Sequence, residues 1–224
     1  MRSATAAFTL IELMVVVTIL AIIASIAIPS MMSARSTANE KSVIATMRAI
    51  VTAQQLAHTN AMIDLNRNGQ GEGASLPELA GAQVLRGSSS VLRPAYLSAS
   101  FGDLDSDGYA SSHGFYFALY LPDATGAGIV AMPANLGSID AQNAEHFWTC
   151  LAWPRDRQLQ GYGTFFTNQS GDILVCKNAT YSGKTSVPPP GAALVGGTPD
   201  RIDRSETAAA GGAAADGNPW RIVP

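Results

Sequence analysis

The stretch FTLIELMVVVTILAIIASIAIP, from Phe8 to Pro29, decides how this chain is organised. Between Phe8 and Ile28 the one charged residue is Glu12, and Pro29 ends the apolar run. At about 1.5 Å of rise per residue, a helix of this length spans the roughly 30 Å hydrocarbon core of a bilayer. The sequence therefore predicts a single membrane-spanning helix over residues 8–28.

An ordinary secretory signal peptide is the competing interpretation, because it also has a basic start and an apolar core. This apolar run is longer than the roughly 7–15 residues of a signal-peptide core. Ala24-Ser25-Ile26-Ala27 imitates a signal-peptidase site, yet no clear mature start follows it. We therefore favour a retained anchor.

Glu12 is the most informative residue of the stretch. A carboxylate in an apolar membrane helix costs several kcal/mol unless it finds a partner, so its default interpretation is functional. If residues 1–7 are removed, Phe8 becomes the N-terminus and Glu12 lies one helical turn further on. Pairing of that new amine with Glu12 of a neighbouring copy would set the axial register of a helical assembly, although pairing within one chain is also open.

The run Ala7-Phe8-Thr9-Leu10-Ile11-Glu12-Leu13-Met14-Val15-Val16 follows a short leader that contains Arg2. It resembles the prepilin processing and N-methylation signal of type IV pilins and type II secretion pseudopilins. The resemblance implies cleavage between Ala7 and Phe8 by a prepilin peptidase, and methylation of the Phe8 amine. The family usually has Gly before the cleavage point, and Ala7 is a mild departure that affects the efficiency of cleavage more than the identity of the signal.

The same resemblance implies partners and a location. The partners are the prepilin peptidase, homologous pilin or pseudopilin subunits, an inner-membrane assembly platform and membrane lipid. The chain is expected to cross the bacterial inner membrane once, with its head in the periplasm, and to enter an assembled pseudopilus or pilus. The formal net charge of −3 gives no support for nucleic-acid binding.

Residues 29–62 are predicted to continue the helix with an amphipathic pattern. Pro29 is expected to kink or loosen the helix where it leaves the apolar part. Apolar residues then recur at three- and four-residue spacing, which is typical of one buried helix face. They are Val43, Ile44, Met47, Ile50, Val51 and Leu56.

Residues 63–180 are predicted to form an α+β head. A capping box at Ser75 predicts a short helix over 76–80, and apolar alternation predicts a strand over 115–121. A second strand over 146–153 and a hairpin of 163–167 with 172–176 complete an antiparallel sheet. The fold class is therefore α+β and pilin-like, with the sheet on the amphipathic half of the long helix. The Pro-, Gly- and Ala-rich segment 181–224 is expected to be a flexible tail without a core of its own.

Asp103, Asp105 and Asp107, followed by Gly108, form the best candidate site of the head. Oxygen ligands at positions one, three and five before a glycine match the first half of a calcium loop. The bidentate Glu expected at position twelve is replaced by Gly114. Ca²⁺ is the candidate cofactor here, and a solvated Asp-rich turn is the alternative.

Asp64, Asn66 and Asn68 repeat this spacing, with Glu72 nearby. Two of the three side chains are amides and bring less negative charge. A loop with Asn and Gly in turn positions is therefore favoured over a second calcium site.

Cys150 and Cys176 fall on two predicted strands. In an oxidising compartment they are compatible with one disulfide that ties neighbouring strands. Two buried free thiols are the alternative.

No enzyme is predicted. His58, His113 and His146 are scattered without metal-ligand spacing, and no nucleophile elbow or phosphate loop occurs. The prediction is a structural subunit of a type II secretion-like pseudopilus, with a type IV pilus subunit as the alternative. An alternative of another class is a membrane-tethered periplasmic binding module that does not polymerise.

Overall fold

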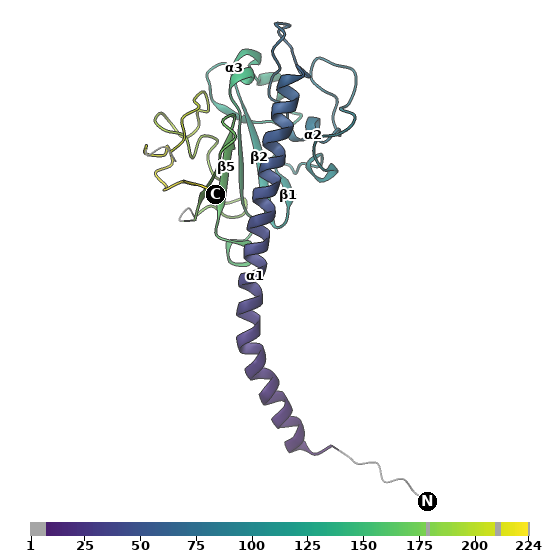
Figure 1. Ribbon diagram of the computed structural model, residues 1–224, viewed down its shortest axis with the longest axis vertical. Coiled ribbons are helices and arrows are strands. Elements are labelled where there is room, and N and C mark those ends of the chain that lie inside the picture. Colours follow the sequence, from purple (N-terminus) through teal and green to yellow (C-terminus); the bar gives the residue numbers. More distant parts are fainter. Residues whose placement is uncertain (1–7, 178–179, 209–211, 224) are drawn as a thin grey trace, which may run out of the picture.

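The computed structural model describes residues 8–177, 180–208 and 212–223. Its largest feature is α1 (Leu10–Thr59), a helix of 50 residues that is about 75 Å long. Figure 1 shows the C-terminal half of α1 lying across the head, while the N-terminal half extends far below it. The predicted long helix is therefore confirmed.

The head is built on one antiparallel sheet, and the described residues contain seven strands of it. The strand order is β1-β2-β4-β5-β6-β7, and β3 pairs with β2. The strands are β1 (Ala110–Ser112), β2 (Phe115–Pro122), β3 (Gly128–Val130), β4 (Thr149–Pro154), β5 (Thr164–Asn168), β6 (Ile173–Cys176) and β7 (Arg221–Ile222).

Short helical turns connect these strands. The predicted capping box is present, since Ser75 caps α2 (Leu76–Leu79) and Glu78 reciprocates. Asp140 caps α3 (Ala141–His146), a helix that was not predicted, so the strand predicted over 146–153 begins only at Thr149. The remaining turns are η1 (Ala99–Phe101), η2 (Leu136–Ser138) and α4 (Arg157–Gln160).

One face of the sheet packs against α1. Every second residue of β2 from Phe115 to Leu121 points to this face, as the alternation predicted, and joins a core with Val43, Met47 and Ile50. Leu56, expected on the same helix face, is exposed, whereas Gln54 is buried and exchanges hydrogen bonds with the backbone of Ala74. The helix–sheet packing is thus confirmed, with Gln54 in place of Leu56.

The opposite face of the sheet is covered by the C-terminal part of the chain. Ala192, Leu194 and Ile202 are fully buried against a second core that contains Trp153 and Phe166. Figure 1 shows this segment, in yellow, on the side of the sheet away from α1. The expectation of a flexible tail without a core is therefore wrong for the described residues beyond 180. The sheet is apolar on both faces, and its second face needs this cover.

Candidate assembly site on the N-terminal helix

The first turn of α1 is closed by a capping box between Thr9 and Glu12. Glu12 Oε2 accepts hydrogen bonds from the Thr9 backbone N–H at 2.9 Å and from its hydroxyl at 2.8 Å. The Glu12 N–H donates to Thr9 Oγ1 at 3.3 Å. Phe8 precedes the cap and is 81% exposed. The carboxylate predicted to pair with an amine therefore lies within one turn of Phe8.

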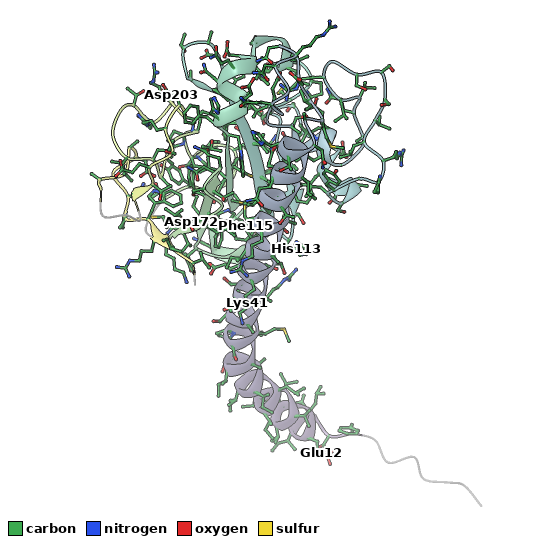
Figure 2. The ribbon with its side chains drawn as sticks, turned by 45° about the horizontal axis from the view of Figure 1, so that its top comes forward. Glu12, Lys41, His113, Phe115, Asp172 and Asp203 are labelled. Atoms are coloured by element: carbon green, nitrogen blue, oxygen red, sulfur yellow. The ribbon has the colours of Figure 1, made fainter. Side chains whose placement is uncertain are left out.

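The N-terminal half of α1 extends away from the head and packs against none of the head residues that the structure describes. Its apolar side chains are exposed on every face of the helix, and the stretch is long and apolar enough to cross a membrane. Figure 2 shows Glu12 at the far end of this half and Lys41 where the helix reaches the head. The exposed side chains include Leu10, Ile11, Leu13, Met14, Val15, Val16, Val17, Ile19, Leu20, Ile22, Ile23, Ile26 and Ile28.

Pro29 lies inside α1, and the helix continues through it without a break. Since proline has no N–H, the carbonyl of Ser25 lacks its usual helical donor. The helix is thus continuous at Pro29, and Figure 1 shows its N-terminal half bent away from the axis of the half that crosses the head, as a kinked or loosened helix would be. The proposed cleavage residue Ala7, with the rest of the leader, lies outside the described residues.

Glu40 fixes α1 to the end of the head nearest the apolar half. Its Oε1 accepts from the backbone N–H groups of Tyr162 and Gly163 at 3.1 and 3.0 Å. Its Oε2 lies 3.6 Å from Lys177 Nζ. These contacts couple the position of the helix to the position of the head.

The Asp103 loop holds a lysine ammonium group. Lys184 Nζ lies 2.8 Å from Asp105 Oδ2 and 2.6 Å from Asp107 Oδ2. Asp105 Oδ1 also accepts from the backbone N–H groups of Asp107 and Tyr109. Asp103 borders the same surface hollow. The structure brings together two of the three predicted ligands, with a cation from the distant residue Lys184 between them.

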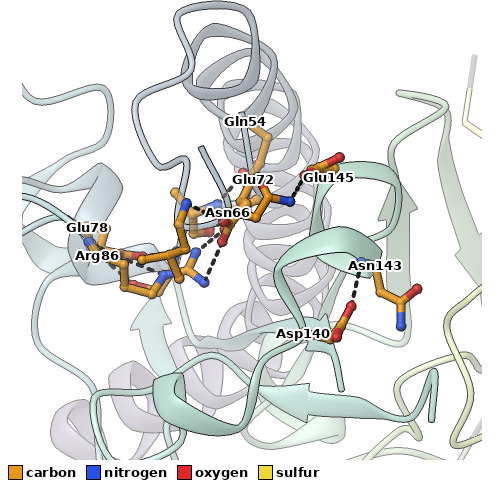
Figure 3. A network of polar contacts seen from close by, with 12 residues as sticks. Gln54, Asn66, Glu72, Glu78, Arg86, Asp140, Asn143 and Glu145 are labelled. Atoms are coloured by element: carbon orange, nitrogen blue, oxygen red, sulfur yellow. Dashed lines mark hydrogen bonds and ion pairs between the residues drawn. The ribbon is translucent and has the colours of Figure 1, made fainter. Parts of the chain in front are cut away.

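The Asp64 loop is tied to α3 by its amides. Asn66 and Asn68 donate to Glu145 Oε1 at 2.6 and 2.8 Å, and Asp64 accepts from the N–H groups of Asn68 and Gly69. Figure 3 shows Asn66 reaching Glu145. Within residues 8–177, 180–208 and 212–223, no three His, Cys, Asp or Glu side chains are arranged to hold a metal ion. Calcium at either loop stays a prediction.

A buried ion-pair network lies behind this loop (Figure 3). Arg86 lies 3.2 Å from Glu78 and 3.6 Å from Glu72, and both carboxylates are fully buried. Burial raises the pKa of Glu72, although the Leu65 N–H and Arg86 act in the opposite direction. Nothing in the local sequence pairs Arg86 with these two residues.

The disulfide prediction is wrong, because Cys150 and Cys176 are both free and buried. Strand β5 lies between β4 and β6, so the two cysteines are not on neighbouring strands. They also face opposite sides of the sheet, where Cys150 contacts Met47 of α1 and Cys176 joins the second core. Strands two positions apart are about 9–10 Å from one another, beyond the roughly 7 Å limit for bonded cysteines.

Sequence reasoning missed Lys184, Glu145 and Glu40. Each acts on residues at least 77 positions away, and no spacing rule links such partners. Of the features that were missed, only the packing of the C-terminal segment on the sheet could have been predicted. Strand β2 carries Tyr116 and Tyr120 on the face opposite its phenylalanines, so the sequence indicates that both faces of the sheet are buried.

The comparisons with known proteins bear on the N-terminus. A model of the prokaryotic N-terminal methylation motif matches residues 2–28. Neither the curated proteins nor the solved structures give a significant match to the chain. The sequence therefore carries a type IV pilin-like prepilin signal, and residues 10–28 of this signal form the exposed apolar half of α1, with Glu12 in its first turn.

Proposed function

We propose that this chain, with its prepilin-type signal, is a structural subunit of a type II secretion-like pseudopilus. It is inserted in the inner membrane through residues 8–28 and assembled through the same helix. The observation that carries the proposal is the apolar half of α1, which is exposed on all faces and begins with one carboxylate, Glu12.

The apolar half of α1 needs a non-aqueous environment. A helix that is apolar all round is stable in lipid or inside a protein assembly, and is unfavourable in water. From Leu10 to Ile28 its length is about 28 Å, close to the roughly 30 Å hydrocarbon core. One helix therefore serves as anchor before assembly and as filament core afterwards.

The charge of Glu12 favours transfer of the helix from the membrane into an assembly. Its carboxylate is bonded to Thr9 in this chain, which satisfies part of its hydrogen-bonding capacity. Once Phe8 is N-terminal, its amine lies beside Thr9 and carries a positive charge. A neighbour's Phe8 amine at the Glu12 carboxylate offsets a charge that is costly alone, and fixes the axial offset between copies.

Glu40 couples the axial position of α1 to the position of the head. Because it binds the backbone of Tyr162 and Gly163, a set position of α1 also sets the position of the sheet.

The breadth of the head favours a pseudopilus over a type IV pilus. The C-terminal residues add a second layer to the sheet, and a thick subunit is harder to stack densely. A type IV pilin, major or minor, is the second candidate. In a membrane-tethered periplasmic binding module that never polymerises, Glu12 would have its cap with Thr9 but no counter-charge from a neighbouring copy.

Two measurements test the proposal. Intact-mass and N-terminal analysis of protein from native membranes should find residues 1–7 lost and Phe8 methylated. Glu12→Gln should abolish the sedimenting assembly, whereas Thr18→Val, a neutral change in the same apolar half, should leave it unchanged. An intact leader, or normal assembly of Glu12→Gln, would contradict the proposal.

A further inference from the structure

The distal end of the head, where α1 ends at Thr59, contains a pocket of about 190 Å³. Its walls come from the last turns of α1, from α3 with the residues after it, and from the turn between β5 and β6. Gln55, His58, Glu145 and Trp148 line it, and no lysine or arginine does so among the described residues. The pocket is therefore negatively charged.

Glu145 is the source of that charge. It is only 7% exposed, and Oε1 is occupied by the amides of Asn66 and Asn68. Its Oε2 has no hydrogen-bond or ion-pair partner among the described residues. This oxygen is open to solvent in the pocket, so a cation that entered the pocket would form a charge-assisted hydrogen bond with it. Trp148 lines the same pocket, and an indole is the best aromatic partner for a cation.

The opposite end of the head, which we call the base, presents basic side chains. Lys177 is bound to α1 at Glu40 through an ion pair and is 65% exposed. Arg221, on the edge strand β7, is exposed and has no side-chain partner among the described residues. With Val175 and Pro219 these two line a groove of about 360 Å³.

Copies inserted in one membrane by the same helix end all point the same way, and they keep this orientation when an assembly stacks them along its axis. In such a stack, the distal end of one head faces the base of the next. A negative pocket at one end and exposed basic side chains at the other are complementary in this arrangement.

We propose that the Glu145 pocket of one copy binds a basic side chain, Arg221 or Lys177, from the base of the next copy. The contact rests on the proposed function, because it needs an assembly of parallel copies. It gives the assembly a second registering contact, made outside the membrane by the heads.

Glu145→Gln is the informative variant. The amide keeps an oxygen for Asn66 and Asn68, so the Asp64 loop is retained, while the charge at Oε2 is lost. It should weaken assembly of the processed full-length chain by roughly tenfold or more, measured as the concentration needed for half of it to sediment. Asp200→Asn, which removes a charge from an exposed turn outside the pocket, should have no effect.

Paired variants identify the source of the basic group. Arg221→Gln or Lys177→Gln should weaken assembly as Glu145→Gln does. A double variant that combines Glu145→Gln with the effective base substitution should assemble no worse than the single variants. Arg93→Gln, another exposed arginine, is the control. Multiplicative losses in the double variants would overturn the contact between copies.

A ligand titration separates the pocket from the assembly. Nα-acetylarginine methylamide, added to detergent-solubilised chain, should bind the wild type and not Glu145→Gln. If it binds while neither base variant affects assembly, the basic group comes from another protein, and the second-copy assignment is overturned. If wild-type chain never sediments, the proposed function itself fails; normal sedimentation of Glu145→Gln overturns this inference alone.

Discussion

The ammonium group of Lys184 lies 2.8 Å from the carboxylate of Asp105, across 79 residues of sequence. It is 2.6 Å from Asp107 as well, so one cation neutralises two of the aspartates that resemble the start of a calcium loop. The contact joins the C-terminal segment to the loop before β1. Calcium binding at this loop would require Lys184 to leave.

Replacing Lys184 with Met should therefore increase calcium binding. The substitution removes a competing cation and leaves Asp105 and Asp107 with uncompensated charge. We expect the calcium affinity to rise by roughly tenfold or more, which corresponds to about 1.4 kcal/mol. Isothermal titration of Ca²⁺ into both proteins measures it, with Lys177→Met as a matched control. Unchanged affinity would mean that these carboxylates are not calcium ligands.

Asp105 should also make stability depend on pH. Partial burial alone would raise its pKa, but hydrogen bonds from Lys184 and from the backbone N–H groups of Tyr109 and Asp107 outweigh burial and lower the pKa. A lowered pKa means that the fold favours the ionised form. The stabilisation is then present above about pH 4 and is lost as the pH falls through the lowered pKa. Asp105→Asn should flatten the acid limb of a plot of unfolding free energy against pH; an unchanged slope would contradict this assignment.

Local patterns predicted the parts of the fold that depend on neighbours in sequence. Three patterns predicted their elements correctly, because each depends on contacts within a few residues: the apolar run to Ile28, the capping box at Ser75 and the alternation of β2. The order of the strands in the sheet depends on contacts between distant residues, so no local pattern predicts it. The insertion of β5 between Cys150 and Cys176 is a fact of topology, and it alone rules out the disulfide.

The composition of the C-terminal segment led to the wrong prediction of a flexible tail. Ala192 and Leu194 lie in a Gly- and Ala-rich stretch that cannot form a core alone, but they complete one against Trp153 and Phe166. The candidate assembly site was predictable since Phe8 and Glu12 are four residues apart. Glu145 and Lys184 were not, because each acquires its role from a loop brought to it by the fold.

Arg86 should be among the most sensitive residues of the head. It is the cation shared by the buried carboxylates of Glu72 and Glu78. Arg86→Met leaves both without a counter-charge, and breaking such a buried pair costs about 3–5 kcal/mol. Thermal and urea unfolding of the detergent-solubilised chain measures the loss. Arg93→Met, at an exposed position, should change stability by about 0.5 kcal/mol or less. Equal effects of the two variants would show that the network contributes little.

The two thiols should stay free and unreactive in the folded protein. Both are buried, and burial raises the pKa of the Cys150 thiol, so little thiolate forms near neutral pH. Titration with a thiol reagent should find two thiols after unfolding and close to none before. Reduction should leave the melting temperature unchanged. A mass two hydrogens lower before reduction would contradict the topology.

Glu40 should stabilise the junction of helix and head through its hydrogen bonds more than through its charge. Glu40→Ala removes the acceptor for the Tyr162 and Gly163 N–H groups, and a partly buried donor left without a partner costs about 1–3 kcal/mol. Glu40→Gln keeps an oxygen for both and loses only the ion pair with the exposed Lys177, worth about 0–1 kcal/mol. Unfolding measurements should therefore rank the wild type and Glu40→Gln close together and Glu40→Ala well below. If assembly follows the same ranking while the anchor remains in the membrane, the head takes its register from α1 through this residue. A Glu40→Ala subunit that assembles normally despite a loosened head would show that the register is set by the helix alone.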